Sequence, residues 1–113
     1  MSKFITRVEL HKVQNRTVTA EDYALLHQKM RAKGFITTIT SDDNITYELP
    51  PAEYRREGML TREVVFNDAK AAAQLVVNTS ANVADYSLII FEYSSAMWYN
   101  LSAVPIDAIK KAF

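Results

Sequence analysis

The two histidines of this 113-residue chain are the side chains best suited to move a proton near neutral pH. His11 follows Arg7 and Glu9 at two-residue spacing, which places all three on one face of a strand. An arginine beside an imidazole can bind a phosphate and transfer a proton. The alternative is an exposed strand face with cross-strand ion pairs, which the usual surface position of charged residues favours.

His27 lies among the apolar positions of a predicted helix, where an imidazole is more often a hydrogen-bonded structural group than a catalyst. RNA cleavage without a metal ion needs a base for the 2′-hydroxyl, an acid for the leaving oxygen and a cation for the phosphorane. The side chains available for these roles are His11, His27, Arg7 and Arg31. We expect any cleavage to need one of the histidines, with Arg7 as its electrostatic partner.

Basic and aromatic side chains occur together near the middle of the chain, and further aromatic side chains follow downstream. These residues are Tyr54, Arg55, Arg56, Tyr93, Trp98 and Tyr99. Aromatic rings stack on single-stranded bases while arginines bind phosphates. The predicted RNA-binding residues are therefore Arg31, Arg55, Arg56, Tyr93 and Trp98. The alternative is that Trp98 and Tyr99 pack onto the core or onto a second subunit.

Metal and cofactor chemistry have little support in the sequence. Asp42 and Asp43 are adjacent carboxylates of the kind that binds Mg²⁺, but they occupy a predicted turn in which aspartate has a sufficient structural role. The chain has no cysteine, no glycine-rich phosphate loop and no histidine cluster with metal-ligand spacing. We expect no cofactor and no metal.

The composition predicts one globular domain spanning residues 1–113, with 49% hydrophobic and 23% charged residues. Thirteen basic and thirteen acidic residues give zero net charge, so RNA binding would have to rest on a local patch. No apolar run approaches membrane-spanning length, and the start of the chain has no extended apolar segment. We therefore expect a cytoplasmic protein without membrane contact.

Periodicity predicts the elements that position these side chains. Alternation predicts a strand over Lys3–Lys12, and Thr19 and Gly34 bound a helix. A hairpin with strands over Phe35–Thr40 and Ile45–Leu49 follows, ended by two prolines. The remaining predictions are a charged loop over 51–59, a helix over 62–78 capped by Thr61, a strand over 85–93 and a short helix from Val104 into the tail.

The order β-α-β-β-α-β predicts an α+β fold of the ferredoxin-like type. Its four-stranded antiparallel sheet would carry two helices on one face and leave the other face open. The predicted core residues are Leu10, Leu26, Ile39, Leu49, Val65, Ala72, Leu88 and Ile90.

The hairpin and the residues after it, T-I-T-S-D-D-x-x-T-Y-x-L-P-x-A-E-Y over 38–54, resemble a signature of the GhoS-type family. The strand at 4–11, the helix and its exit over 22–35, the last strand around 86–89 and W-Y-x-L at 98–101 extend the resemblance. The chain differs in a longer 13–18 loop, in lacking a glycine after the aspartate pair and in the tail at 102–113. The resemblance implies a ferredoxin-like fold and a small bacterial antitoxin, from a type V toxin–antitoxin pair, that cleaves single-stranded mRNA.

A second function class fits the same residues. Ile5, Phe91 and Tyr93 would lie on the open sheet face, where apolar side chains often close against a second copy or a protein partner. The alternative prediction is thus a non-catalytic regulatory or immunity-like module that binds a protein through this face.

Overall fold

The computed structural model describes residues 1–105 and confirms an α+β fold. Its elements are β1 (Ser2–Lys12), α1 (Ala20–Ala32), β2 (Thr38–Thr40), β3 (Thr46–Glu48), β4 (Glu53–Gly58), α2 (Arg62–Thr79) and β5 (Val83–Tyr93). The predicted terminal helix falls mainly on residues 106–113, which lie outside the described part of the chain.

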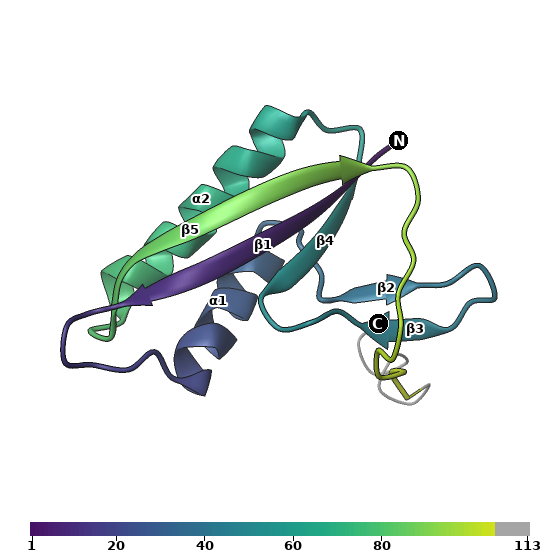
Figure 1. Ribbon diagram of the computed structural model, residues 1–113. Coiled ribbons are helices and arrows are strands. Elements are labelled where there is room, and N and C mark those ends of the chain that lie inside the picture. The colour runs from purple at the N-terminus through teal and green to yellow at the C-terminus, as the bar shows by residue number, and fades with distance from the viewer. Residues whose placement is uncertain (106–113) are drawn as a thin grey trace.

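The main sheet has three antiparallel strands in the order β4-β1-β5, and both helices cover one of its faces (Figure 1). The hairpin β2–β3 forms a separate two-stranded sheet beside β4. Its link to the main sheet is a bridge in which the backbone N–H groups of Ile36 and Arg55 donate to each other's carbonyl oxygens at 2.8 and 2.7 Å. The expected sheet of four strands is therefore a three-stranded sheet with a short, displaced hairpin.

The charged loop predicted over 51–59 is wrong for most of its length, because residues 53–58 form β4 and pair with β1. Tyr54 is fully buried under the helices, and the Arg56 guanidinium donates to Asp68 of α2 at 2.6 Å. Because Arg56 has an acidic partner on α2, it can lie on the covered face of the sheet. The contact of Arg56 with a residue of a distant helix cannot be predicted from the local periodicity of the sequence.

The alternation predicted for β1 is confirmed. Phe4, Thr6, Val8 and Leu10 are buried against the helices. The buried residues of α2 are Val65, Ala69, Ala72, Ala73 and Val76, and the three alanines let the helix lie close to the sheet. Among the predicted core residues, five are buried and three, Leu49, Leu88 and Ile90, are half-buried.

The helix boundaries follow from their caps. Thr19 and Asp22 form a reciprocal capping box, in which the Thr19 N–H donates to Asp22 Oδ2 at 2.8 Å and the Asp22 N–H donates to Thr19 Oγ1 at 3.2 Å. Thr61 caps α2 through the Val64 N–H. Gly34 ends the first helical segment with a φ of +92°, a left-handed conformation that favours glycine.

The hairpin is held by the segment that follows β5. The Glu48 N–H donates to the Ser102 carbonyl at 2.9 Å, and the Val104 N–H donates to the Thr46 carbonyl at 2.8 Å. This segment crosses the hairpin in Figure 1, so the C-terminal end of the described chain lies against the hairpin. The hairpin and the segment 94–104 therefore support each other.

Candidate functional site

A groove of about 760 Å³ lies between the open sheet face and the hairpin. Its lining residues include Lys3, Ser41, Asp42, Arg55, Glu57, Tyr93 and Trp98. We call this the hairpin groove. It brings together three of the predicted RNA-binding residues, from β4, from the end of β5 and from the segment after it.

Strand register positions the sheet side of the hairpin groove. Lys3 lies directly opposite Glu57 on β4 and opposite Tyr93 on β5, so these three side chains share the open face. The Arg55 guanidinium donates to the Thr38 carbonyl at 3.0 Å and to Glu57 at 2.9 Å. Arg55 is thereby fixed at the groove, whereas Lys3 is in no ion pair within the described residues.

The aromatic wall of the groove comes from Tyr93 and Trp98. Partial burial raises the pKa of the Tyr93 phenol, while the nearby Arg55 cation lowers it in part. The Trp98 ring packs against Tyr47 of the hairpin with a centroid distance of 5.5 Å. These two rings give the groove π surfaces beside a cation, which is the pattern that binds single-stranded nucleic acid.

Arg56 does not join the hairpin groove. Successive side chains of a strand point to opposite faces, so Arg56 lies on the helix side while Arg55 faces the groove. The Arg56 guanidinium also packs over the Phe35 ring at 5.2 Å. Arg56 therefore forms an ion pair and a cation–π contact on the helix-covered face of the sheet.

A second cavity, of about 480 Å³, opens at the base of the same hairpin and contains His27 and Arg31. We call it the histidine cavity. His27 Nδ1 lies 2.6 Å from the Tyr54 hydroxyl, and the two rings meet edge to face. Burial first, and the Arg31 cation second, lower the pKa of His27 below its ordinary 6.5. The imidazole is therefore neutral at neutral pH.

The far wall of the histidine cavity is built from the turn Pro50–Ala52 and the segment 100–102. Ala52 has a φ of +64°, a left-handed conformation that is costly for a residue with a side chain, and its carbonyl accepts a bond from the Val8 N–H at 3.0 Å. Glu48 and Glu53 add two carboxylates to the lining. The cavity therefore holds a base, a cation and acids within one enclosure.

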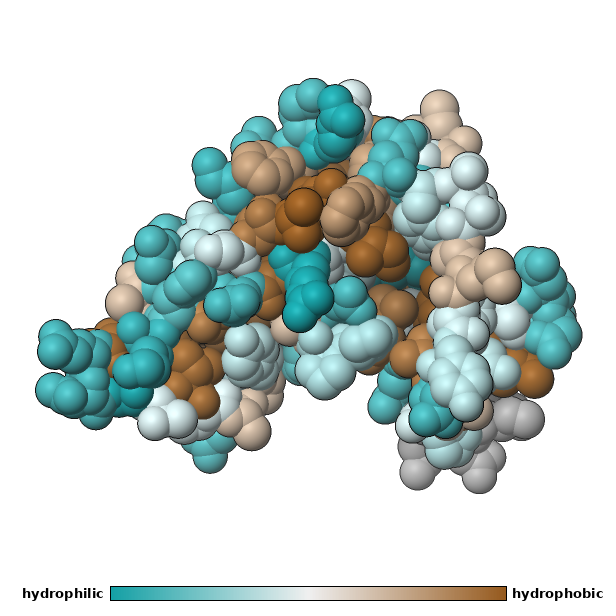
Figure 2. Space-filling view, viewed as in Figure 1, coloured by the Kyte–Doolittle hydropathy of each residue, from teal (hydrophilic) through white to brown (hydrophobic). Residues whose placement is uncertain are grey.

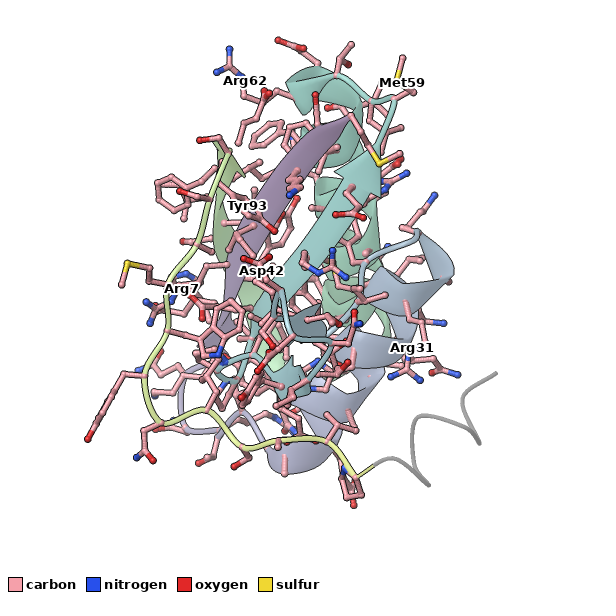
Figure 3. The ribbon with its side chains drawn as sticks, turned by 90° about the vertical axis from the view of Figure 1, so that its right-hand side faces the viewer. Arg7, Arg31, Asp42, Met59, Arg62 and Tyr93 are labelled. Carbon is pink, nitrogen blue, oxygen red and sulfur yellow. The ribbon has the colours of Figure 1, made fainter. Side chains whose placement is uncertain are left out.

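The predicted pair Arg7 and His11 lies elsewhere, on the open face of β1. They are four residue steps apart along the strand, which is roughly 13 Å. His11 Nε2 lies 2.7 Å from the Ser87 hydroxyl on β5, which ties down the ring. Figure 3 shows Arg7 and Arg31 on opposite sides of the strands. The structure thus joins His27 with Arg31 and keeps Arg7 and His11 apart from them.

Sequence reasoning missed three partners in these sites. Tyr54 was treated only as an aromatic neighbour of the arginines, and Lys3 and Ser87 were not singled out. Lys3 did carry a local signal, because it precedes Arg7 by four residues and an even separation places both residues on one strand face. The contacts of Tyr54 and Ser87 depend on long-range packing, so no local sequence pattern indicated them.

The described residues contain no group of three acidic, histidine or cysteine side chains that could hold a metal ion. Asp43 accepts a hydrogen bond from the Ser41 hydroxyl at the hairpin tip, and Asn44 there has a φ of +64°. Asp43 therefore has the turn role that was predicted for the aspartate pair. Between residues 1 and 105, no helix is long and apolar enough to cross a membrane.

Comparison with known proteins found no match: no family model, no curated protein and no solved structure matches the chain. The proposed function therefore depends on the family resemblance, the fold and the two cavities described above.

Proposed function

We propose that this protein binds single-stranded RNA in the hairpin groove and is a small cytoplasmic antitoxin-type endoribonuclease, as its resemblance to the GhoS-type family implies. The observation that carries the proposal is the convergence of Lys3, Arg55, Tyr93 and Trp98 on one groove. Cations for phosphates beside rings for bases are what sequence-tolerant binding of a single strand requires.

The fold supports the same proposal. Ile36 pairs with Arg55 on the outer side of β4, so the hairpin begins at the place of a fourth strand in the order β5-β1-β4-β2. We propose that the domain is a ferredoxin-like plait whose second strand leaves the sheet early and turns into the hairpin. This departure opens the groove between hairpin and sheet.

Cleavage is assigned to the histidine cavity. An RNA strand that follows the hairpin from tip to base passes from the groove, lined by 94–98, to the cavity, lined by 100–102. With Nδ1–H donating to the Tyr54 oxygen, His27 Nε2 accepts the 2′-hydroxyl proton. The 2′-oxygen attacks the phosphorus, the 5′-oxygen leaves with a proton from solvent, and Arg31 stabilises the phosphorane. These steps use side chains and solvent and need no metal ion, so cleavage is expected to continue in EDTA.

Fluorescence anisotropy with a short labelled oligouridine at low salt tests the binding step. Trp98→Ala removes one stacking ring and is expected to weaken binding about 5- to 150-fold, since one stacked base contributes about 1–3 kcal/mol. Tyr99→Ala is the matched control, because Tyr99 is 92% exposed and does not line the groove. Equal affinities for the two variants would exclude the hairpin groove as the binding site.

A non-catalytic protein-binding module is the second candidate. Ile89 and Phe91 are 51% and 54% exposed on the open sheet face, and Figure 2 shows an apolar patch there. Affinity purification from the native host distinguishes the two candidates. Co-purifying RNA supports the first, and a stoichiometric protein of different sequence without RNA supports the second.

A further inference from the structure

The outer edge of β5 presents backbone hydrogen-bonding groups that no other described strand of the main sheet pairs with. β5 is eleven residues long and pairs with β1 along one side, and no other strand of residues 1–105 pairs with its second side. Edge strands are usually protected from further pairing by lysine, proline, a short length or a bulge. The sequence of β5, VADYSLIIFEY, contains neither lysine nor proline. This edge is open to another strand.

Apolar side chains line both sides of that edge. On the open face, Ile89 and Phe91 are each about half exposed. On the helix side, Phe66 of α2 is 40% exposed and borders a groove of about 360 Å³ with Leu88 and Ile90. In Figure 2 part of this apolar surface is visible over β5. A strand added at the edge would cover apolar surface on both faces.

We propose that the occupant is a second copy of this chain, paired antiparallel through β5 about a two-fold axis at Ile89. Residues directly opposite in an antiparallel pair point to the same face, so a two-fold axis must place one residue opposite itself. An axis at Ile89 places each Leu88 opposite the second copy's Ile90. The result is one continuous six-stranded sheet with all helices on one face.

Side-chain chemistry selects Ile89 over the neighbouring position. With the axis at Ile89, Asp85 faces the second copy's Tyr93, and Glu92 faces the second copy's Tyr86, so both carboxylates meet a phenol hydroxyl. With the axis at Leu88, the same carboxylates would face Phe91 and an alanine. Opposite polar pairs and opposite apolar pairs are the favoured cross-strand arrangement.

The other edge of the sheet does not offer an equivalent surface. β4 is bridged on its outer side by Ile36, and its open-face residues are Glu53, Arg55 and Glu57. A head-to-tail pairing of β5 with β4 would therefore displace the hairpin, whereas pairing of β5 with itself leaves each hairpin in place. The self-paired dimer also needs no RNA, so its test does not depend on the proposed function, although Tyr93 belongs to both surfaces.

Sedimentation velocity of the full chain across micromolar concentrations tests this proposal. The expected species has twice the monomer mass of 12.8 kDa. Ile89→Lys would place two ammonium groups opposite each other on the axis and is expected to weaken the dimer at least about 30-fold. Ile45→Lys is the matched control, because Ile45 is 41% exposed on the hairpin. A monomeric wild type, or a dimer that survives Ile89→Lys, would overturn the proposal.

A mixing experiment checks the axis itself. Ile89→Lys and Ile89→Glu are each expected to be monomeric, and an equimolar mixture is expected to form heterodimers because opposite charges then meet at the axis. The chain has no cysteine, so Ile89→Cys provides a single thiol, and mild oxidation should cross-link it across the two-fold axis while Ile45→Cys remains uncross-linked. Absence of both the heterodimer and the cross-link would place the interface elsewhere.

Discussion

The two histidines differ because their neighbours differ. His11 is exposed on a strand and meets a serine hydroxyl, whereas His27 is half-buried and meets a tyrosine hydroxyl beside an arginine. Burial raises the pKa of Tyr54, so its proton stays on the phenol and the contact with His27 is a hydrogen bond between neutral groups. Only His27 therefore combines a neutral ring, a fixed orientation and an adjacent cation.

The lowered pKa of His27 predicts the pH dependence of cleavage. A base must be unprotonated, so the cleavage rate is expected to rise with pH, with a midpoint below pH 6.5, and then to reach a plateau. Arg31→Gln removes the cation that helps lower this pKa, so the rise should move to higher pH and the plateau should fall. His27→Ala is expected to lower turnover about 10²-fold or more, while His11→Ala leaves it near wild type. Pre-steady-state cleavage across pH measures all three variants, and full activity in His27→Ala would remove the histidine cavity from the mechanism.

Asp22 is a structural carboxylate whose surroundings lower its pKa to about 2. The largest cause is the hydrogen bond from the Ser80 hydroxyl at 2.5 Å, followed by the Thr19 backbone, with Asn82 contributing at 3.2 Å. These contacts join the start of α1 to the loop between α2 and β5. One ionised side chain thus connects two segments that are distant in the sequence.

Asp22→Asn is expected to lower the free energy of unfolding at pH 7 by about 1–3 kcal/mol, because charge-assisted hydrogen bonds are lost. The pKa of Asp22 is lowered on folding, so its stabilisation is complete above about pH 4 and disappears as the pH falls towards 2. The stability gap between wild type and variant should therefore close over that range. Urea unfolding at several pH values measures the gap, and a constant gap would contradict the assignment.

Elements with local signals were predicted well. β1, α1, α2 and β5 begin and end within about two residues of their predicted limits, because period-2 or period-3.6 patterns and threonine caps are written into neighbouring residues. β4 was missed because its sequence is mostly charged. Its strand pattern can be explained only once the ion pair of Arg56 with Asp68 and the packing of the core are known. The hairpin strands are shorter than predicted, since the chain bends away from the sheet after Ile36.

The candidate site was predicted in part. Arg55, Tyr93 and Trp98 were chosen for their chemistry and lie on one groove, although 43 residues separate the first from the last. Arg56 was grouped with Arg55 because the two are adjacent, and adjacency in a strand places side chains on opposite faces. The pairing of His27 with Tyr54 follows from docking α1 onto β4, which the sequence pattern did not contain.

Leu26 on α1 and Leu88 on β5 differ in burial, so replacing each by alanine is expected to lower the free energy of unfolding by different amounts. Leu26 on α1 is fully buried, so Leu26→Ala is expected to lower the free energy of unfolding by about 2–5 kcal/mol. Leu88 on β5 is only half-buried, so Leu88→Ala should cost about half as much, less than the full-burial value expected for a core position. Chemical denaturation of both variants at dilute concentration compares them. Equal losses would mean that β5 is covered in solution.

At the scale of the whole molecule, the proposed function depends on a groove between two parts of a chain that has zero net charge. The three-stranded sheet and its helices contain the core, while the hairpin and the 94–104 segment form one wall of each cavity. Such a molecule attracts RNA weakly at long range, so affinity must come from short-range stacking and from a few phosphate contacts.

Weak long-range attraction predicts an unusually shallow salt dependence of RNA binding. The hairpin groove offers two cations, Lys3 and Arg55, and each phosphate contact with a single strand contributes about −0.7 to the slope of log K against log salt. The expected slope is about −1.4 for wild type and about −0.7 for Lys3→Gln. Lys12→Gln is the control, because Lys12 lies at the far end of β1 outside the groove and should leave the slope unchanged. A steep slope, or one that Lys3→Gln does not reduce, would mean that RNA binds a different and more basic surface of the molecule.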